Sequence, residues 1–375
     1  MGDTIEFSEL KPPERILMGP GPSNVHYRVY RALTTPIIGH LDPDFMKIMD
    51  DICEMLRFVF QTKNKLTIPI SGTGSSGMEA SFVNVLEPGD KVVIGVNGVF
   101  GERMVDVATR CGAEVIRIDE EWGYIIDPNR VIETLKKHPE VKVFAVVHAE
   151  TSTGAMQPLE EIGKFLKGGE TLFVVDAVTS LAGCELRVDE WGIDICYSGT
   201  QKCLSVPPGL SPITLSEKAL SVLHSKKSKA QSWYLDLSMI ERYWGEERFY
   251  HHTAPISMLF ALREGLRIIL GEGLEERFKR HQTVGDYLKS GLMELGWKLF
   301  AQEGYRLPML TSVILPDGLN DAEARRKLLY DYGIEVGVGL GKTRGEVWRI
   351  GLMGETCKRQ NADALLLAIR DLIRK

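Results

Sequence analysis

The sequence has 375 residues, of which 44% are hydrophobic and 26% charged, the composition of a folded chain with a large core. This balance excludes a disordered or fibrous protein, and at this length we expect about two to three domains. The formal net charge of −6 argues against a nucleic-acid-binding surface, because such proteins usually carry a basic patch.

The six cysteines also narrow the class of protein. They stand at positions 53, 111, 184, 196, 203 and 357, with no CxxC pair and no zinc spacing, so we expect reduced thiols and no metal site. The N-terminal MGDTIEFSELKPPER lacks the apolar core of a secretory signal, and the final DLIRK does not match a peroxisomal address. No apolar run approaches the roughly 18 residues that suggest a membrane span. We therefore expect a cytoplasmic protein that binds neither nucleic acid nor membranes.

Short runs rich in valine and isoleucine alternate with amphipathic stretches through the first two thirds of the chain. Such alternation is typical of βαβ units and a mostly parallel sheet, and continuous apolar strands indicate burial on both faces. Helices are expected at GMEASFVNVLE, FGERMVDVATRCG, DPNRVIETLKKH and PLEEIGKFLKGG. Strands are expected at residues 66–71, 91–96, 113–118, 143–149, 171–177, 194–199 and 210–215. The pattern predicts an α/β fold with a large domain around a seven-stranded sheet.

The order of elements changes after the helix SMLFALREGLRIILGEG, at a glycine-flanked break near Gly271. A long helix (274–295) is followed by strands near WKLFA and LTSVILP, the helix DAEARRKLLYDYG, strands IEVGV and EVWRIGL, and a final helix (359–374). This order predicts a smaller C-terminal α+β domain. We therefore divide the chain into an N-terminal arm (1–19), a large domain (20–270) and a small domain (271–375).

The segment GTGSSG, at residues 72–77, is a literal G-x-G-x-x-G between a strand and a helix. A dinucleotide site would also need an acid at the end of the next strand, which instead ends IGVNG, and a P-loop would need Lys-Ser or Lys-Thr where Met78-Glu79 stand. Backbone N–H groups of a glycine-rich turn at a helix start still form a cup for one phosphate. Thr73, Gly74 and Ser75 are the candidate residues, and an ordinary glycine turn is the alternative.

Two residues provide the chemistry that pyridoxal phosphate (PLP) requires of its protein. Asp176 ends the apolar strand FVVD, where a carboxylate could keep a pyridinium nitrogen protonated or could simply cap the next helix. Lys202 follows the small polar residues of YSGTQ, a setting without another charge, and a lysine there could form a Schiff base. A solvated surface lysine is the alternative.

At these residues the chain resembles the class V aminotransferases of PLP fold type I, and within them the alanine–glyoxylate and serine–pyruvate branch. The S-G-T-Q-K run followed by PPG is the part of the resemblance most typical of the family, and the likeness extends over about residues 15–375. It implies a homodimeric PLP enzyme with active sites at the subunit interface. It also implies that Lys202 holds the cofactor covalently and then moves a proton as general acid and base, with Gln201 and Val178 beside the cofactor.

Three further segments extend the resemblance. GPGPSNV (19–25) is similar to a glycine-rich motif beside the substrate and implicates Gly21, while HAETSTG (148–154) implies that Ser152 faces the cofactor phenolate or the substrate. FYHHTAP (249–255) resembles a segment whose Tyr and Thr reach the neighbouring subunit's phosphate, which implicates Tyr250 and Thr253. Turns and a helix entry are the alternatives for these three segments.

Arg349 stands inside the apolar strand EVWRIGL, where an unpaired arginine would be costly. Its planar fork matches a carboxylate, so it could wait for the α-carboxylate of an amino acid, or it could form an ion pair within the protein. Its place matches the carboxylate-binding arginine of the family. In one position the chain departs from the family, because Phe100 stands where a tryptophan often stacks on the cofactor ring.

The sequence therefore predicts a transaminase that moves the amino group of alanine or serine to glyoxylate or pyruvate. Other class V activities stay open, namely hydroxykynurenine or ureidoglycine transaminase and a cysteine desulfurase, for which Cys357 is the late candidate thiol. From another class, an NAD(P)-linked oxidoreductase built on GTGSSG is the alternative. His40 is a candidate specificity residue, or an ordinary loop histidine.

Overall fold

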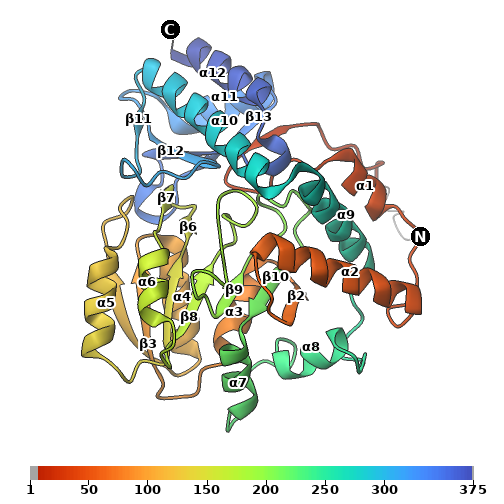
Figure 1. Ribbon diagram of the computed structural model, residues 1–375. Coiled ribbons are helices and arrows are strands. Elements are labelled where there is room, and N and C mark those ends of the chain that lie inside the picture. Colours follow the sequence, from red (N-terminus) through yellow and green to blue (C-terminus); the bar gives the residue numbers. More distant parts are fainter. Residues whose placement is uncertain (1–6, 374–375) are drawn as a thin grey trace, which may run out of the picture.

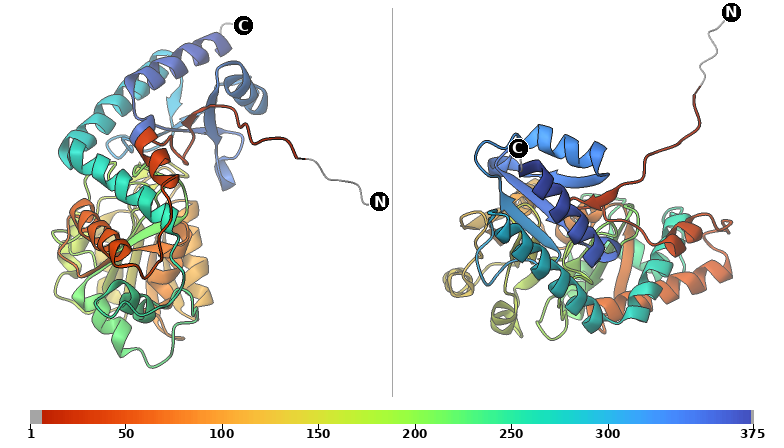
Figure 2. Two further views of the ribbon diagram at one scale, coloured as in Figure 1. Left: turned by 90° about the vertical axis from the view of Figure 1, so that its right-hand side faces the viewer. Right: turned by 90° about the horizontal axis from the view of Figure 1, so that it is seen from above.

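The structure is a computed structural model, and residues 7–373 are described. They form a large α/β domain and a smaller C-terminal domain, each with its own sheet (Figure 1). Seen from the side, the N-terminal segment runs along the small domain before the chain turns down into the helices of the large domain (Figure 2). The α/β fold predicted from the sequence is confirmed.

The large domain is built on a seven-stranded sheet in the order β2-β10-β9-β8-β5-β3-β4. Only β10 runs against its neighbours, β2 and β9, and the other described pairs are parallel. All residues of β5 and β8 are buried, which explains their unbroken apolar sequences. The strands are β2 (Leu66–Ser71), β3 (Lys91–Val96), β4 (Glu114–Asp119), β5 (Val143–Val147), β8 (Leu172–Asp176), β9 (Ile195–Tyr197) and β10 (Leu210–Leu215).

Helices cover the large sheet. Helix α3 packs on β9 and β10, α4 on β3 and β4, and α6 on β8. Helices α1 and α2 pack against α9. These helices are α1 (Tyr27–Leu33), α2 (Pro43–Phe60), α3 (Gly74–Val83), α4 (Val99–Arg110), α5 (Pro128–Lys137), α6 (Glu160–Leu166), α7 (Glu217–Ser225), α8 (Leu237–Trp244) and α9 (Ile256–Glu272).

Several helix starts are encoded locally. The side chain of Asp42 accepts a hydrogen bond from the backbone N–H of Asp44, with Pro43 in the first turn, and Asp127 does the same for Asn129. Ser216 caps α7 through the N–H of Ala219. Each cap satisfies a backbone donor that the helix itself leaves unpaired.

The small domain contains a five-stranded sheet in the order β1-β13-β14-β12-β11, in which only β1 runs parallel to its neighbour. Its strands are β1 (Ile16–Met18), β11 (Lys298–Leu299), β12 (Leu310–Ile314), β13 (Ile334–Val338) and β14 (Val347–Gly351). Its helices are α10 (Leu274–Glu294), α11 (Asp321–Asp331), α12 (Arg359–Ile373) and the short turns η1 (Gly341–Thr343) and η2 (Gly354–Thr356). The domain limits expected above stay a prediction, although β1, from the expected arm, pairs with β13.

The parallel strands β3, β5 and β8 end at the same edge of the large sheet, and the small hairpin of β6 (Ala149–Glu150) and β7 (Ala155–Met156) lies there, facing the small domain (Figure 1). Ligands of open α/β sheets bind at this edge. Among residues 7–373, the structure contains no helix that is both long enough and apolar enough to cross a membrane.

Candidate active site

Asp176 is the last residue of β8 and is only 3% exposed. Its Oδ1 accepts a hydrogen bond of 2.8 Å from the N–H of Val178. Asp176 therefore also caps the turn that follows the strand, which is the alternative role considered above. Its Oδ2 accepts one of 2.9 Å from the hydroxyl of Tyr197. Burial raises the pKa of Asp176 to about 6, whereas the two hydrogen bonds favour the ionised form. A cationic ring nitrogen nearby would favour that ionised form further.

Lys202 lies in the turns that follow β9 and is 9% exposed, so it is not a surface lysine. Its Nζ donates a hydrogen bond to the carbonyl oxygen of Pro20. Burial, and after it the positive charge of Arg349, lower the pKa of Lys202 to about 8, while the charge of Asp176 acts the other way. A lysine with such a pKa is partly neutral near neutral pH and can act as a nucleophile.

Gly21 brings its backbone against this lysine. Its φ is +108°, and a Cβ at this position would lie 2.6 Å from Cδ and 2.7 Å from Nζ of Lys202. Nearby, the hydroxyl of Ser23 donates to the carbonyl oxygen of Lys202 at 2.9 Å, and the N–H of Ser23 donates to that of Gln201 at 2.9 Å. The N-terminal glycine motif therefore packs directly on the lysine loop.

The glycine-rich turn places the start of α3 beside the loops that carry Asp176 and Lys202. Thr73 is its N-cap residue and makes no side-chain capping bond, and both Thr73 and Ser75 are exposed. A Cβ at Gly74 would lie 2.9 Å from Cγ2 of Val178 and 3.7 Å from Cα of Gly199. The open N–H groups of this helix start can accept an anion.

Two of the predicted cofactor contacts border the same space. Val178 is half-buried and lies close to both Gly74 and Gly199. The Oε1 atom of Gln201 is buried and, among the described residues, has no hydrogen-bond partner. Buried polar atoms rarely stay unpaired, so a ligand group at this position is the simplest partner.

A buried acid that we did not predict organises the segment around Phe100 and Ser152. Glu150 has no exposed surface. Its Oε2 accepts from the N–H groups of Phe100 (3.1 Å) and Gly101 (3.4 Å), and its Oε1 accepts from the hydroxyl (2.5 Å) and N–H (3.1 Å) of Ser152. Burial raises the pKa of Glu150 despite these donors. The Ser152 hydroxyl proton is thus directed at Glu150, while its oxygen accepts from Val99 N–H at 2.9 Å.

Arg349 lies on β14 and is 6% exposed. Its Nε donates to the carbonyl oxygen of Val338 at 2.8 Å, and its Nη1 donates to that of Thr151 at 3.3 Å. Burial lowers the pKa of Arg349 to about 10, and the charge of Glu150 counteracts this. Because no carboxylate among residues 7–373 forms an ion pair with Arg349, the alternative of an internal ion pair is wrong. The guanidinium is available to an incoming carboxylate.

Tyr250 and Thr253 are the predicted residues that the structure does not bring into this group. Both are exposed, and their hydroxyls lie 3.4 Å apart. The ring of His40 lies 5.1 Å from that of Tyr250. Within the described part of the chain, no hydrogen bond connects either hydroxyl with the loops of Asp176 or Lys202.

Sequence reasoning also missed Tyr197 and the carbonyl of Pro20. Tyr197 faces Asp176 because the two residues are partners across β8 and β9, and this register cannot be read from the sequence. Glu150 could have been found, because it is the one acid in the segment HAETSTG (148–154), directly before the small and polar residues TSTG.

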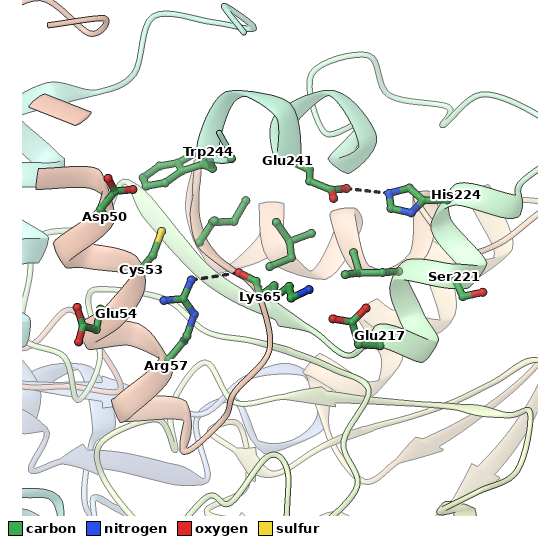
Figure 3. Close-up of a pocket in the computed structure, with 14 residues that line it drawn as sticks. Asp50, Cys53, Glu54, Arg57, Lys65, Glu217, Ser221, His224, Glu241 and Trp244 are labelled. Atoms are coloured by element: carbon green, nitrogen blue, oxygen red, sulfur yellow. Dashed lines mark hydrogen bonds and ion pairs between the residues drawn. The ribbon is translucent and has the colours of Figure 1, made fainter. Parts of the chain in front are cut away.

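A pocket of about 590 Å³ lies elsewhere, between α2, α7 and α8 (Figure 3). Several of its polar groups already have partners, since His224 pairs with Glu241 at 2.8 Å and Arg57 donates to the carbonyl oxygen of Lys65 at 3.3 Å. None of the residues predicted for the cofactor or the substrate lines this pocket. It is therefore not the candidate active site.

The residues at the strand ends fit PLP. The group offers a buried acid for the ring nitrogen, a partly neutral lysine for the aldehyde, and a glycine-rich helix start with the unpaired Gln201 oxygen near it. The close approach at Gly74 leaves room only for a residue without a side chain. Asp176 and Arg349 both lie near enough to Lys202 for their charges to influence its pKa.

Comparisons with known proteins agree with this arrangement. The family model "Aminotransferase class-V" matches residues 23–348. The (S)-ureidoglycine–glyoxylate transaminase of Bacillus subtilis is 42% identical, over 97% of this chain and 92% of that protein. The alanine–glyoxylate aminotransferase of Callithrix jacchus is 41% identical, over 97% and 89%. The crystal structure of an alanine–glyoxylate aminotransferase from Nostoc sp. superimposes with a TM-score of 0.96 and 46% identity, over 99% of this chain and 98% of that one.

Proposed function

The chain belongs to the class-V aminotransferase family, whose members depend on PLP, and we propose that it moves the amino group of alanine or serine to glyoxylate or pyruvate. The observation that carries this proposal is the joint burial of Lys202 and Arg349, because the charge of Arg349 lowers the pKa of Lys202 and neither side chain forms an ion pair with a carboxylate of the described residues. Such a pair suits a substrate with an amino group and a carboxylate on one carbon. Glyoxylate as acceptor is supported by the names of both kinds of relative.

When bound, PLP supplies an electron sink for the bond broken at the substrate Cα. Asp176 holds the ring nitrogen in its protonated form, which an adjacent carboxylate favours. Lys202 would hold the cofactor covalently and, once its amine is free, would take the proton from the substrate Cα and deliver it to C4′ of the cofactor. A pKa near 8 suits both tasks, because the amine can accept and release a proton near neutral pH.

The remaining predicted residues bind and orient. Phe100 and Val178 would hold the cofactor ring by packing against it, and Ser152 would contact the phenolate or the substrate. Thr73, Gly74, Ser75 and Gln201 hold the phosphate at the start of α3. Arg349 binds the α-carboxylate with its planar fork, and Gly21 lets the backbone beside the substrate approach Lys202 closely.

We further propose a homodimer in which Tyr250 and Thr253 reach the phosphate in the neighbouring subunit's site. Their outward exposure supports this assignment. Mixing the inactive variants Lys202→Ala and Tyr250→Phe/Thr253→Ala tests it, because a mixed dimer then contains one site with no substitution. Recovered activity on mixing is expected. If the mixture is as inactive as its components, the two residues serve their own subunit's site.

The substitution Lys202→Ala tests the chemistry, with Lys47→Ala, on the exposed surface of α2, as the control. Loss of the visible absorbance of bound PLP together with loss of turnover is expected for Lys202→Ala alone. A Lys202→Ala variant that keeps full transaminase activity contradicts the assignment. Mass spectrometry of the borohydride-reduced protein should find the cofactor on Lys202.

A matrix of donors and acceptors decides the substrates. Alanine, serine, (S)-ureidoglycine and hydroxykynurenine are each paired with glyoxylate and with pyruvate, and we expect the highest kcat/KM for alanine or serine. Ureidoglycine is the second candidate, because a transaminase named for it is 42% identical to this chain. A preference for ureidoglycine over alanine would replace the proposed donor.

Two other activities are disfavoured. A cysteine desulfurase needs an accessible thiol, but Cys357 is fully buried and burial raises its pKa to about 11. An NAD(P)-linked oxidoreductase is set aside because the chain belongs to a PLP-dependent family. The cytoplasmic location stays a proposal, which is supported by the six buried and unbridged cysteines.

A further inference from the structure

A buried ionic cluster joins α9 to α10. It contacts the loops that follow Asp176 and Lys202, and also the chain that follows the strand of Arg349. We refer to four residues as the junction cluster: Glu272, at the end of α9, and Arg277, Arg280 and His281, on α10. Arg277 is 3% exposed and His281 is fully buried. None of these residues is among those to which the sequence assigned a role.

All three nitrogen atoms of the Arg277 guanidinium are hydrogen-bonded. Nε donates to the carbonyl oxygen of Ala182 at 3.0 Å, Nη2 to that of Cys203 at 2.5 Å, and Nη1 to Oε2 of Glu272 at 2.5 Å. Ala182 lies in the turns that follow Asp176, and Cys203 directly follows Lys202. One side chain from the small domain therefore fastens the two loops that carry the predicted cofactor residues.

Arg280 and His281 hold the chain after β14, the strand that carries Arg349. Arg280 donates from Nη1 to the carbonyl oxygens of Gly354 (2.9 Å) and Cys357 (2.8 Å), and it pairs with Glu272 at 2.5 Å. The N–H of Gly354 donates to Nε2 of His281 at 2.9 Å, so the proton of this neutral ring sits on Nδ1, which donates to the carbonyl oxygen of Arg277 at 2.8 Å.

The backbone held by the cluster is strained. Ala182 and Ser205 have φ angles of 62° and 52°, in a region that residues with a side chain seldom occupy. Ser205 is also held from the small domain, because its hydroxyl accepts from the N–H of Glu355 at 2.7 Å. Such conformations persist only where the surroundings over-determine them. The loops after β8 and β9 are therefore set by their contacts and would relax without them.

From these contacts we propose that Arg277 is a positioning residue, which through the junction cluster sets the lysine loop relative to the strand that carries the substrate-binding arginine. Its catalytic consequence rests on the function proposed above. An amino acid must reach Lys202 with its reacting carbon while Arg349 holds its carboxylate, so an error in the spacing weakens substrate binding in the loaded enzyme.

The positioning role depends on the guanidinium group of Arg277 and not only on its charge. A rigid planar fork can serve three acceptors in one plane, whereas a lysine is a point charge that can replace only part of this set. Arg277→Met removes all the donors and keeps much of the aliphatic stem. Arg277→Lys keeps the charge opposite Glu272. The matched control is Arg267→Met, which removes an exposed arginine of α9 whose one ion pair within residues 7–373 is with Glu264, at 3.0 Å.

The experiment measures amide hydrogen exchange and steady-state kinetics of the holoenzyme, with kcat expressed per bound PLP. For Arg277→Met we expect faster exchange in residues 178–184 and 199–205, unchanged exchange in α4, and a KM for the amino donor raised about tenfold, with a smaller change in kcat. For Arg277→Lys, the exchange rates of the two loops and the KM should lie between those of Arg277→Met and those of the wild type. Arg267→Met should match the wild type.

Unchanged exchange in both loops overturns the proposal, and so does a KM that stays at the wild-type value while kcat per bound PLP falls. If Arg277→Met does not fold, Arg277→Lys and Glu272→Gln decide by the same two measurements, and both should raise KM. An inactive wild-type enzyme would contradict the proposed function alone, because the exchange of the two loops is measured without substrate.

Discussion

The hydroxyl of Tyr197 donates a 2.9 Å hydrogen bond to Oδ2 of Asp176, between partner residues of adjacent strands. Both side chains are buried, and burial raises the pKa of the Tyr197 hydroxyl well above its usual value, so Tyr197 acts as a neutral donor. The bond supports the carboxylate that is expected to face the cofactor ring nitrogen.

Removing this hydroxyl should weaken cofactor binding. In Tyr197→Phe, the loss of a donor raises the pKa of Asp176 above about 6, so less of the carboxylate is ionised to pair with the ring. A hydrogen bond to a charged group contributes about 1.5–3 kcal/mol, so we expect the Kd of PLP to rise at least about tenfold. Titration of the cofactor-free protein measures it, with the exposed Tyr330→Phe as control. Equal Kd values in both variants would show that the bond is unimportant.

Gly21→Ala should displace the side chain of Lys202, in addition to lowering the stability of the fold. The new Cβ would lie 2.6 Å from Cδ of Lys202, in addition to the strain of a residue with a φ of +108°. Gly89→Ala is a matched control, because Gly89 has a φ of +88° and nothing within 4 Å of its would-be Cβ. Both variants should lose about 1–2 kcal/mol of stability from the backbone alone.

Only Gly21→Ala should also lower kcat, by about tenfold or more, because it moves the reacting amine. Thermal melting and kinetics of the two variants separate the effects. Similar kcat values in the two variants would mean that contact with Lys202 is not what requires glycine at this position.

Covalent attachment of PLP should depend on pH through Lys202. Burial, followed by the charge of Arg349, lowers the pKa of Lys202 to about 8, so the rate of attachment to cofactor-free protein should rise with pH and level off above this value. In Arg349→Met the midpoint should move to higher pH, because one source of the lowering is lost. Stopped-flow absorbance measures both midpoints. A midpoint that does not move assigns the whole shift to burial.

The same group should also contribute to stability as a function of pH. Because the pKa of Lys202 is lower in the folded chain than its ordinary 10.5, the unfolded chain binds more protons between pH 8 and 10.5. The contribution of Lys202 to the free energy of unfolding of cofactor-free protein therefore rises with pH across this window. Denaturation of Lys202→Met at several pH values should lack this slope, and an unchanged slope would contradict the lowered pKa.

Glu150→Gln tests the buried acid beside the cofactor site. Glu150 accepts four hydrogen bonds, and an amide would turn one acceptor into a donor that faces the donors of Phe100 or Ser152. An unsatisfied buried group costs about 1–3 kcal/mol, so we expect a loss of this size in cofactor-free protein. Glu161→Gln, on the exposed side of α6, is the control. Equal melting temperatures would mean that the site tolerates the amide.

Much of the fold could be predicted because the strands are short and apolar and most are separated by amphipathic helices. The strands expected at 66–71, 91–96 and 210–215 agree with the structure to the residue. The small-domain elements also appear in the expected order. The strand at Ile16–Met18 was missed, because three apolar residues show no periodicity and their partner lies more than 300 residues away.

Some residues of the candidate site could be predicted from the sequence, and others could not. Asp176, Lys202 and Arg349 stand out because each is a charge in an apolar or small-residue setting, and the structure buries all three. Arg277 gives no such indication, since on an amphipathic helix it looks like one of several solvated charges. Its role depends on two carbonyl oxygens from distant loops, and backbone atoms leave no trace in a sequence.

The parallel pairing of Ile16–Leu17–Met18 with Ile334–Glu335–Val336 orders events during synthesis on the ribosome. The edge strand β1 leaves the ribosome before every element of the large domain, and its partner β13 leaves after all of them. The small-domain sheet is therefore completed only after the large domain has had time to fold, and a nascent chain that ends before β14 lacks the strand that carries Arg349.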